Sequence, residues 1–454
     1  MFRNTRHIHL VAVGGIGMSG IAEILLNLDY RVSGSDLHES KSTLRLAEMG
    51  ATIFIGHKAE QISGADVIVY SSAVPESNPE LIEARRNKVP VIRRAEMLAE
   101  LMRLKYGIAV AGSHGKTTTT SLIAEALVGG NLDPTVVVGG RALATGANAV
   151  LGKGEYLVAE ADESDGSFLK LLPTLAVVTN MDLEHVDFYP DMDALRDAFR
   201  TFLDKVPFYG AAVLCIDDPE VRALIPGLDR KIITYGFSDD AEVKAVKNDS
   251  GEVSVFVNDS ELGVLSIQLP GDHNILNALA AVAVGMELGV SFGQISLALK
   301  NFQGVSRRYE RRGIISGVEV VDDYGHHPTE ISATLKVAAS TQKRIVALFQ
   351  PHRYSRTARF TEEFADALAL ADHVALLPVY AASEVAPSGV GSHLIADAME
   401  RKDATVDLLS GQDELPGWLD ENVKSGDLFL TLGAGDIGRL VDEICELLKN
   451  RKSN

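Results

Sequence analysis

The stretch Ile108-Ala109-Val110-Ala111-Gly112-Ser113-His114-Gly115-Lys116-Thr117 decides how this chain folds. Its first four residues are apolar, which is typical of a buried strand. Two glycines and a Lys-Thr pair follow, and residues 118–124 (TTTSLIA) have the composition of a helix start. A strand, a glycine-rich loop and a helix in this order are the context that a phosphate-binding loop requires. We therefore expect an α/β sheet with a nucleotide at the carboxyl end of this strand.

The loop carries the groups that hold the phosphates of ATP. Backbone N–H groups and the positive helix end would face the phosphates, Lys116 would neutralise the β- and γ-oxygens, and the Thr117 hydroxyl would ligate Mg²⁺. The standard loop has a glycine where Val110 stands, so an ordinary glycine turn before a helix is the alternative. The residues predicted to bind ATP are Gly112, Ser113, His114, Gly115, Lys116, Thr117 and Thr118.

Acidic residues follow two further strand-like segments. Residues 160–165 (EADESD) come directly after Tyr156-Leu157-Val158-Ala159, and residues 180–185 (NMDLEH) come after Leu175-Ala176-Val177-Val178. Parallel strands deliver their functional loops at the carboxyl end, so these acids and His185 are expected near the phosphate loop. There they could hold up to two Mg²⁺ ions. The alternative is that they are solvated loops.

A second glycine motif lies near the N-terminus. Gly15, Gly17 and Gly20 match G-x-G-x-x-G after the strand-like segment His7–Val13, and Asp36 lies 21 residues beyond Gly15. This spacing predicts a backbone that can approach a diphosphate, whether in NAD or in a UDP-sugar. A purely structural glycine turn is the third possibility. A further motif, Gly433–Gly438, is interpreted as a tight turn at the edge of a sheet.

Short Val/Ile-rich runs alternate with helix-like segments along the whole chain, which indicates an α/β protein with mostly parallel sheets. Boundaries near residues 106 and 313 divide it into three groups. Between about 235 and 269 alternating short strands predict an antiparallel extension. A long apolar helix over Ile275–Leu288 follows.

Basic and histidine-rich segments follow two strands of the last group, at residues 322–328 (DDYGHHP) and 350–356 (QPHRYSR). Arg353 and Arg356, three residues apart, could grip a carboxylate in bidentate fashion; a solvated basic surface is the alternative. No cysteine lies nearby, so a structural zinc is not expected. Asn274 could cap the long helix, while the amide of Asn277 could pair with an adenine edge.

Composition narrows the class of protein. The 454 residues carry a net charge of −19, which argues against a nucleic-acid binder. No apolar run approaches the roughly 20 residues of a membrane helix, and no signal peptide is seen. Cys215 and Cys445 are expected to be reduced core residues. An acidic cytoplasmic enzyme is the expectation.

Together these motifs resemble the Mur ligase family, and most closely its alanine-adding members. The resemblance spans essentially the full length and rests on eight segments in order: residues 14–23, 112–119, 160–165, 180–185, 271–274, 307–310, 322–328 and 352–356. It implies a Rossmann-like UDP-sugar-binding domain (1–106), a central P-loop ATPase domain with a mostly parallel sheet (107–312) and a Rossmann-like amino-acid-binding domain (313–454). The implied reaction is ATP- and Mg²⁺-dependent ligation of L-alanine to UDP-N-acetylmuramate, by a monomer or homodimer.

The resemblance also implies roles for individual residues. Lys116, Glu160, His185 and Asp323 would be catalytic, and Thr117, Glu160 and His185 would hold metal. His273, Asn277 and Arg308 would complete the ATP site, and Tyr324, His352, Arg353 and Arg356 would bind the amino acid. The UDP-sugar would contact Gly14, Gly15, Ile16, Gly17, Met18, Ser19, Asp36, Ser71 and Ser72.

One position differs from the family pattern, and one lysine is a candidate for a modification found in sister ligases. Family members usually carry glycine where Ala12 stands. Several sister ligases use a carbamylated lysine between the metals, for which Lys205 is the candidate by position, although alanine-adding members are expected to manage without one. Three rival functions remain: a ligase that attaches a whole tripeptide to the same nucleotide sugar, an NAD-dependent oxidoreductase, and a non-catalytic sensor of the nucleotide sugar.

Overall fold

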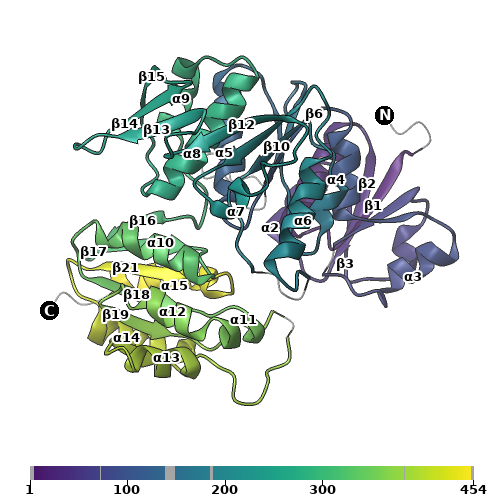
Figure 1. Ribbon diagram of the computed structural model, residues 1–454. Helices are drawn as coiled ribbons and strands as arrows, with labels where there is room; N and C mark the ends of the chain where they lie inside the picture. The colour runs from purple at the N-terminus through teal and green to yellow at the C-terminus, as the bar shows by residue number, and fades with distance from the viewer. Residues whose placement is uncertain (1–4, 72, 139–148, 185–187, 383, 451–454) are drawn as a thin grey trace. The chain divides into compact units, whose positions relative to one another are not determined.

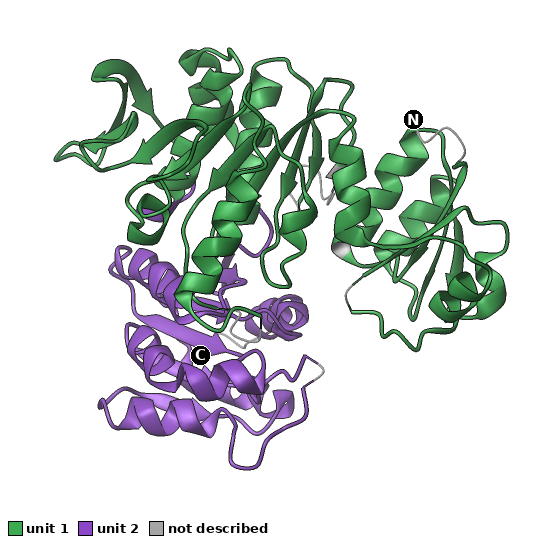
Figure 2. Cartoon of the chain, turned by 45° about the vertical axis from the view of Figure 1, so that its right-hand side comes forward, with its two compact units in different colours: residues 1–268, 274–303 green, residues 269–273, 304–454 purple. Residues whose placement is uncertain are grey.

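The computed structural model describes residues 5–71, 73–138, 149–184, 188–382 and 384–450. It contains sheets of five, ten and six strands, with helices between the strands (Figure 1). The chain forms two compact units, residues 1–268 with 274–303 and residues 269–273 with 304–454 (Figure 2). The first unit holds the five- and ten-stranded sheets, and the second holds the six-stranded sheet. In the described chain, no helix is both long and apolar enough to cross a membrane.

The five-stranded sheet is wholly parallel, with strand order β3-β2-β1-β4-β5. Because β1 pairs with both β2 and β4, the order reverses at β1, and the glycine motif follows β1 at this switch point. Its elements are β1 (His7–Val11), α1 (Ile16–Asn27), β2 (Arg31–Asp36), α2 (Lys41–Glu48), β3 (Thr52–Ile55), η1 (Ala59–Ile62), β4 (Val67–Tyr70), α3 (Pro79–Arg86), β5 (Val91–Arg93) and α4 (Arg94–Met102).

The ten-stranded sheet has the order β15-β14-β13-β12-β11-β10-β6-β9-β7-β8. Strands β7, β9, β6, β10, β11, β12 and β13 are parallel, and β14 and β15 continue antiparallel, as the alternating pattern predicts. The strands are β6 (Tyr106–Ala111), β7 (Thr135–Val137), β8 (Ala149–Val150), β9 (Tyr156–Glu160), β10 (Leu175–Val178), β11 (Ala211–Cys215), β12 (Lys231–Gly236), β13 (Val243–Lys247), β14 (Val253–Val257) and β15 (Ser260–Leu265). The helices are α5 (Lys116–Gly129), η2 (Ser167–Lys170), α6 (Met192–Leu203), α7 (Pro219–Arg222), α8 (Asp272–Glu287) and α9 (Phe292–Asn301).

The six-stranded sheet has the order β16-β17-β21-β18-β19-β20, parallel except for β16. Its strands are β16 (Glu310–Ile315), β17 (Val318–Asp323), β18 (Ile345–Phe349), β19 (His373–Leu376), β20 (Val406–Leu408) and β21 (Leu428–Leu432). Its helices are α10 (Pro328–Ala339), α11 (Tyr354–Arg359), α12 (Thr361–Leu368), α13 (His393–Glu400), η3 (Gln412–Glu414), α14 (Leu415–Asn422) and α15 (Ile437–Lys449). The turn at Gly433 follows β21, which lies inside the sheet, so the expectation of a turn at the sheet edge is wrong.

Alternation along β21 explains why helices cover both faces of this sheet. Leu428 and Leu430 pack in a core with residues of α10, α12 and α13, whereas Phe429 packs in a second core with residues of α14 and α15. In the first unit, one continuous core joins α1 and α4 to strands of both sheets. Cys215 and Cys445 are both free and buried, as expected.

Candidate active site

The phosphate loop lies where the sequence predicts, between the end of β6 and the start of α5. Strand β6 is paired with β9 on one side and β10 on the other, so the loops after all three strands meet at one end of the sheet. Gly112 has a φ of +135°, and a side chain there would collide with the Thr179 hydroxyl. Gly115 has a φ of +79° and caps α5. Glycine is therefore required at both positions.

The segment after β10 supports the loop through hydrogen bonds. The Asn180 side chain accepts from the His114 N–H at 2.8 Å and donates to the His114 carbonyl at 3.1 Å. Thr179 donates to the same carbonyl at 2.7 Å. The Asp182 carboxylate lies 3.2 Å from His114 Nε2. These contacts give residues 179–182 a role in shaping the loop, beyond the acidic function predicted for them; His185 lies outside the described residues.

Lys116 is held by Glu163, one of the acids of residues 160–165 that the sequence predicts near the phosphate loop. Its Nζ donates to both oxygens of Glu163, at 3.0 and 2.9 Å, and to the carbonyl of Gly112 at 2.5 Å. Burial alone would lower the pKa of Lys116, but the charges of Glu163 and Asp162 outweigh it and raise that pKa. Lys116 is thus a buried, protonated cation already engaged with an anion.

Asn277 of α8 packs on the opposite side of the loop. Its Oδ1 accepts from the Thr119 hydroxyl at 3.0 Å, and its Nδ2 donates to Asn274 at 3.2 Å. A side chain at Gly115 would lie only 2.7 Å from Asn277 Oδ1. The amide therefore supports the loop, and its predicted contact with adenine stays a prediction. His273 lies at the start of α8, and desolvation by the surrounding chain lowers its pKa.

The residues proposed to hold Mg²⁺ suit that ion. Thr117 lies in the first turn of α5, and Glu160 ends β9, where it pairs in register with Val110 of β6. A hydroxyl and a carboxylate are the oxygen ligands that Mg²⁺ prefers. Lys205, the candidate for carbamylation, donates from Nζ to the Leu169 carbonyl, and burial lowers its pKa.

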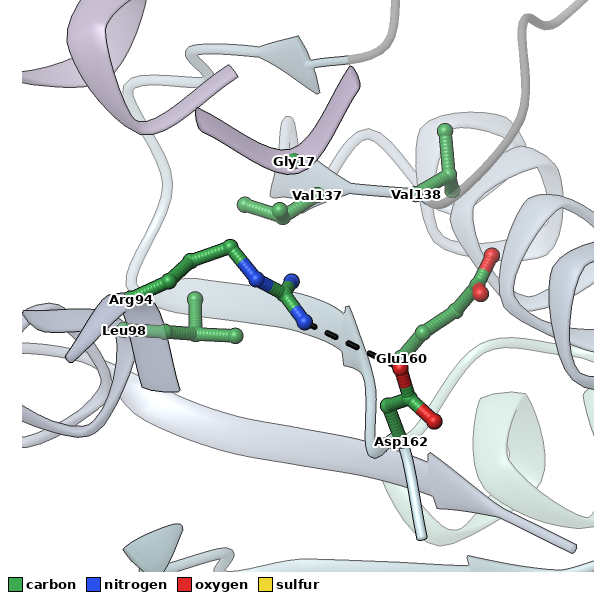
Figure 3. Close-up of a pocket in the computed structure, with 7 residues that line it drawn as sticks. All are labelled: Gly17, Arg94, Leu98, Val137, Val138, Glu160 and Asp162. Carbon is green, nitrogen blue, oxygen red and sulfur yellow. Dashed lines mark ion pairs between the residues drawn. The ribbon is translucent and has the colours of Figure 1, made fainter. Parts of the chain in front are cut away.

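A pocket of about 180 Å³ opens beside Glu160 (Figure 3). It is lined by Gly17, Arg94, Leu98, Val137, Val138, Glu160 and Asp162. The first glycine motif and the acids after β9 therefore share one cavity in the first unit. Arg94 and Leu98, both on α4, are lining residues that the sequence analysis did not select, because no motif marks them.

The N-terminal glycine turn is braced by Asp36. The Gly14 N–H donates to Asp36 Oδ2 at 2.8 Å, and a side chain at Gly14 would lie 2.9 Å from that oxygen. Met18 and Ser19 are buried in α1, and Ser71 follows β4. Ser72 and the side chain of Ile16 lie outside what the structure describes. The predicted residues that the structure describes thus lie at, or just after, the carboxyl ends of β1, β2 and β4.

Ala12 has a φ of +63°, in the left-handed region that favours glycine. We expect Ala12→Gly to stabilise the protein by up to about 1 kcal/mol, because relief of the left-handed strain exceeds the added entropy of the unfolded chain. Thermal unfolding of the two proteins measures this. Glycine introduced instead at Ala22, which is buried within helix α1, should destabilise. A lower melting temperature for Ala12→Gly would contradict the expectation.

In the second unit, Asp323 ends β17 and organises the turns around it. Its carboxylate accepts from the backbone N–H of Tyr309 and of Gly325, both at 2.7 Å. Burial raises the pKa of Asp323 to about 6, against the lowering effect of Arg308. The Arg308 guanidinium lies 5.1 Å from the centre of the Tyr324 ring and 3.6 Å from a Glu330 oxygen. Arg308 thus contacts Tyr324, and its charge acts on Asp323, so the three residues form one cluster.

His352, Arg353 and Arg356, which are predicted to bind the amino acid, follow β18 at the turn into α11 and in its first residues. His352 stacks on Tyr380 at 5.6 Å between ring centres, and its ring lies 5.7 Å from that of His326. Arg353 has a φ of +70°, a strained conformation for a non-glycine residue. Among the described residues, the Nδ1 atom of His352 and the Nη1 atom of Arg356, both buried, have no hydrogen-bond partner. Buried polar groups normally have one, so these atoms point to a missing polar ligand.

Stability of the second unit should fall in acid. Burial and nearby arginines lower the pKa of His352 to about 4, and burial lowers that of His326 to about 3. Both stay neutral in the folded protein, while unfolded histidine takes up a proton below about pH 6.5. The histidines therefore cause a loss of stability as the pH falls from about 6.5 towards 4. The raised pKa values of Asp322 and Asp323 offset part of this loss, because these carboxyls take up protons more readily in the folded protein.

The only tryptophan, Trp418, lies in this unit, so its fluorescence can follow unfolding at pH 7, 6 and 5. His352→Gln should reduce the proton uptake on unfolding by up to about one. The exposed His393→Gln serves as the matched control. Equal pH dependence in wild type and His352→Gln would contradict the expectation.

Comparison with known proteins covers the whole chain. Three family models match: "Mur ligase family, catalytic domain" over residues 7–106, "Mur ligase middle domain" over 110–285 and "Mur ligase, glutamate ligase domain" over 307–435. A UDP-N-acetylmuramate–L-alanine ligase of Desulfatibacillum aliphaticivorans is 50% identical, covering 97% of this chain and 98% of its own. A solved UDP-N-acetylmuramate-alanine ligase of Thermotoga maritima is 30% identical with a TM-score of 0.81, covering 97% and 99%. A murein peptide ligase of Psychrobacter arcticus, 24% identical with a TM-score of 0.74 and coverage of 99% and 100%, shares the fold.

Proposed function

The chain belongs to the Mur ligase family, and on that premise we propose that it joins L-alanine to the lactyl carboxylate of UDP-N-acetylmuramate, using ATP. The reaction yields an amide, ADP and phosphate, and it supplies a peptidoglycan precursor. The observation that carries the proposal is the full-length likeness to ligases named for this reaction. The phosphate loop supports the use of ATP.

Chemistry requires the substrate carboxylate to be activated before an amine can attack it. The ATP γ-phosphoryl group is transferred to a carboxylate oxygen, which gives an acyl phosphate and ADP. Lys116 stabilises the charge that develops on the phosphoryl oxygens, and Mg²⁺ held by Thr117 and Glu160 would supply further positive charge. The alanine amine then attacks the acyl carbon, and the tetrahedral intermediate loses phosphate to leave the amide.

Orientation of the alanine is assigned to the second unit. Arg353 and Arg356 bind its carboxylate, and Tyr324 and His352 border it, so the amine is aimed at the acyl phosphate. His273, Asn277, Arg308 and Asp323 are assigned to the nucleotide. Gly14–Ser19, Asp36, Ser71 and Ser72 are assigned to the UDP-sugar. We further propose the domain limits 1–106, 107–312 and 313–454, a cytoplasmic location, and a monomer or homodimer.

A phosphate-release assay with UDP-N-acetylmuramate and ATP, run across the twenty amino acids, tests the function. Release should be greatest with alanine, and mass spectrometry should find the alanyl product. If product forms only with a tripeptide, the proposal is wrong and the protein is the tripeptide-adding ligase. Tight NAD binding without ATP-dependent phosphate release would instead favour an oxidoreductase.

A further inference from the structure

We propose that Arg94 binds the diphosphate of the UDP-sugar and is the cation of that site. The inference rests on the proposed function and deepens it, because it assigns the ligand of a pocket whose arginine belongs to no motif. Arg94 would act as a positioning residue, distant in sequence from the glycine turn that it completes.

Arg94 is the first residue of α4, and its guanidinium lies directly over the glycine turn. A side-chain carbon built on Gly17 would be only 2.8 Å from Arg94 Nη1. Gly17 lies within α1 and lacks a positive φ, so its backbone conformation is open to any residue. Glycine at this position leaves room for the guanidinium beside the turn.

The guanidinium crosses the pocket towards Asp162, as Figure 3 shows. Arg94 Nη2 and Asp162 Oδ2 are 3.8 Å apart, which is longer than a charge-assisted hydrogen bond. Asp162 is anchored separately, since its Oδ1 accepts from the Ser164 N–H at 3.1 Å. About a third of the Arg94 side chain is exposed, and more of Asp162. The pair is thus a loose contact that a better anion can replace.

The diphosphate of the UDP-sugar is an anion that can replace Asp162 as the partner of Arg94. The residues predicted for the UDP-sugar include the acid Asp36 but no cation, although the ligand carries at least two negative charges. A guanidinium presents paired N–H donors that match two phosphate oxygens. Nη1 faces the glycine turn, whose backbone is the predicted phosphate cradle, while Nη2 faces Asp162. The arginine therefore lies where it can reach the diphosphate without leaving its pocket.

Calorimetric binding of UDP, UDP-N-acetylmuramate and uridine to the full chain, without ATP, tests the assignment. We expect Arg94→Gln to weaken UDP and UDP-N-acetylmuramate by a similar factor, about 10- to 100-fold, and to leave uridine binding unchanged. Arg94→Lys should recover part of the loss, because it restores the charge without the paired donors. Arg103→Gln, an exposed charge change at the end of the same helix, should bind like wild type.

Unchanged UDP binding in Arg94→Gln would overturn the inference, and so would a loss seen with UDP-N-acetylmuramate but not with UDP. Equal weakening of uridine would point to a structural role and overturn it as well. Asp162→Asn keeps the pocket but removes the competing charge, so it should not weaken UDP. If the wild-type protein binds UDP but forms no ligation product, the proposed function is wrong. The UDP-binding measurements would still test whether Arg94 binds the diphosphate.

Discussion

Replacing Lys116 with alanine should abolish ligation, lowering kcat by at least about 10²- to 10³-fold, while binding of UDP-N-acetylmuramate stays close to that of the wild type. Removal of one donor that stabilises charge in a transition state typically has an effect of this size. The UDP-sugar is assigned to the turn after β1, in a different sheet of the first unit, so its binding should not depend on Lys116. Phosphate release and calorimetry measure the two quantities.

The control for Lys116 must account for Glu163. Lys116→Ala leaves a buried carboxylate without its partner, which can destabilise a protein by about 3–5 kcal/mol. The double variant Lys116→Ala/Glu163→Gln removes both charges and should regain stability without regaining ligation. Ligation by either variant at near wild-type rate would contradict the role assigned to Lys116.

Arg356→Ala should raise the KM for alanine by about 10- to 10³-fold, with the KM values for ATP and UDP-N-acetylmuramate little changed. Truncating one partner of a buried, charged hydrogen bond commonly costs about 2–5 kcal/mol, or about 30-fold to a few thousand-fold in affinity, which overlaps most of this range. The basis is the buried Nη1 atom of Arg356, which has no hydrogen-bond partner among the described residues, as is also true of His352 Nδ1. Steady-state kinetics with each substrate varied in turn provide the measurement.

Arg359, exposed on the same helix, offers a matched control. Its guanidinium lies 5.3 Å from the Phe360 ring, and Arg359→Ala should keep the wild-type KM for alanine. Arg356→Lys should recover only part of the affinity, since lysine cannot form the bidentate pair. If Arg356→Ala instead changed the KM for ATP and not that for alanine, the amino-acid site would have to be placed elsewhere.

The sequence predicted the features that depend on local order along the chain. Gly112, Gly115 and Lys116 lie on a strand-loop-helix unit, and the alternating segments before Leu265 form the antiparallel extension. The turn after β1 and the bracing by Asp36 also follow from spacing, because the acid ends the neighbouring strand β2. Such features can be predicted because they involve only elements that are close together in the sequence.

Other features depend on contacts between distant segments, so no pattern predicted which residues would pair. Glu163 pairs with Lys116 over 47 positions, and Asn277 meets Thr119 over 158. Arg94 joins the glycine turn only because α4 packs beside α1. The position of β21 inside its sheet also depends on strand order, and strand order cannot be read from the segment around Gly433. Ala12 is different, because the sequence already showed that family members usually have glycine there. The structure shows why glycine suits the position, since the φ of Ala12 is positive.

The ion pair between Lys116 and Glu163 bears on how this enzyme could be inhibited. A compound with a phosphate-like group at the loop must displace a carboxylate that makes two bonds to the lysine. Part of its binding free energy is therefore lost in that exchange. A compound that ends short of Lys116 leaves the pair intact and avoids the loss. Fragment screening against this site should consequently favour neutral heterocycles over phosphate mimics.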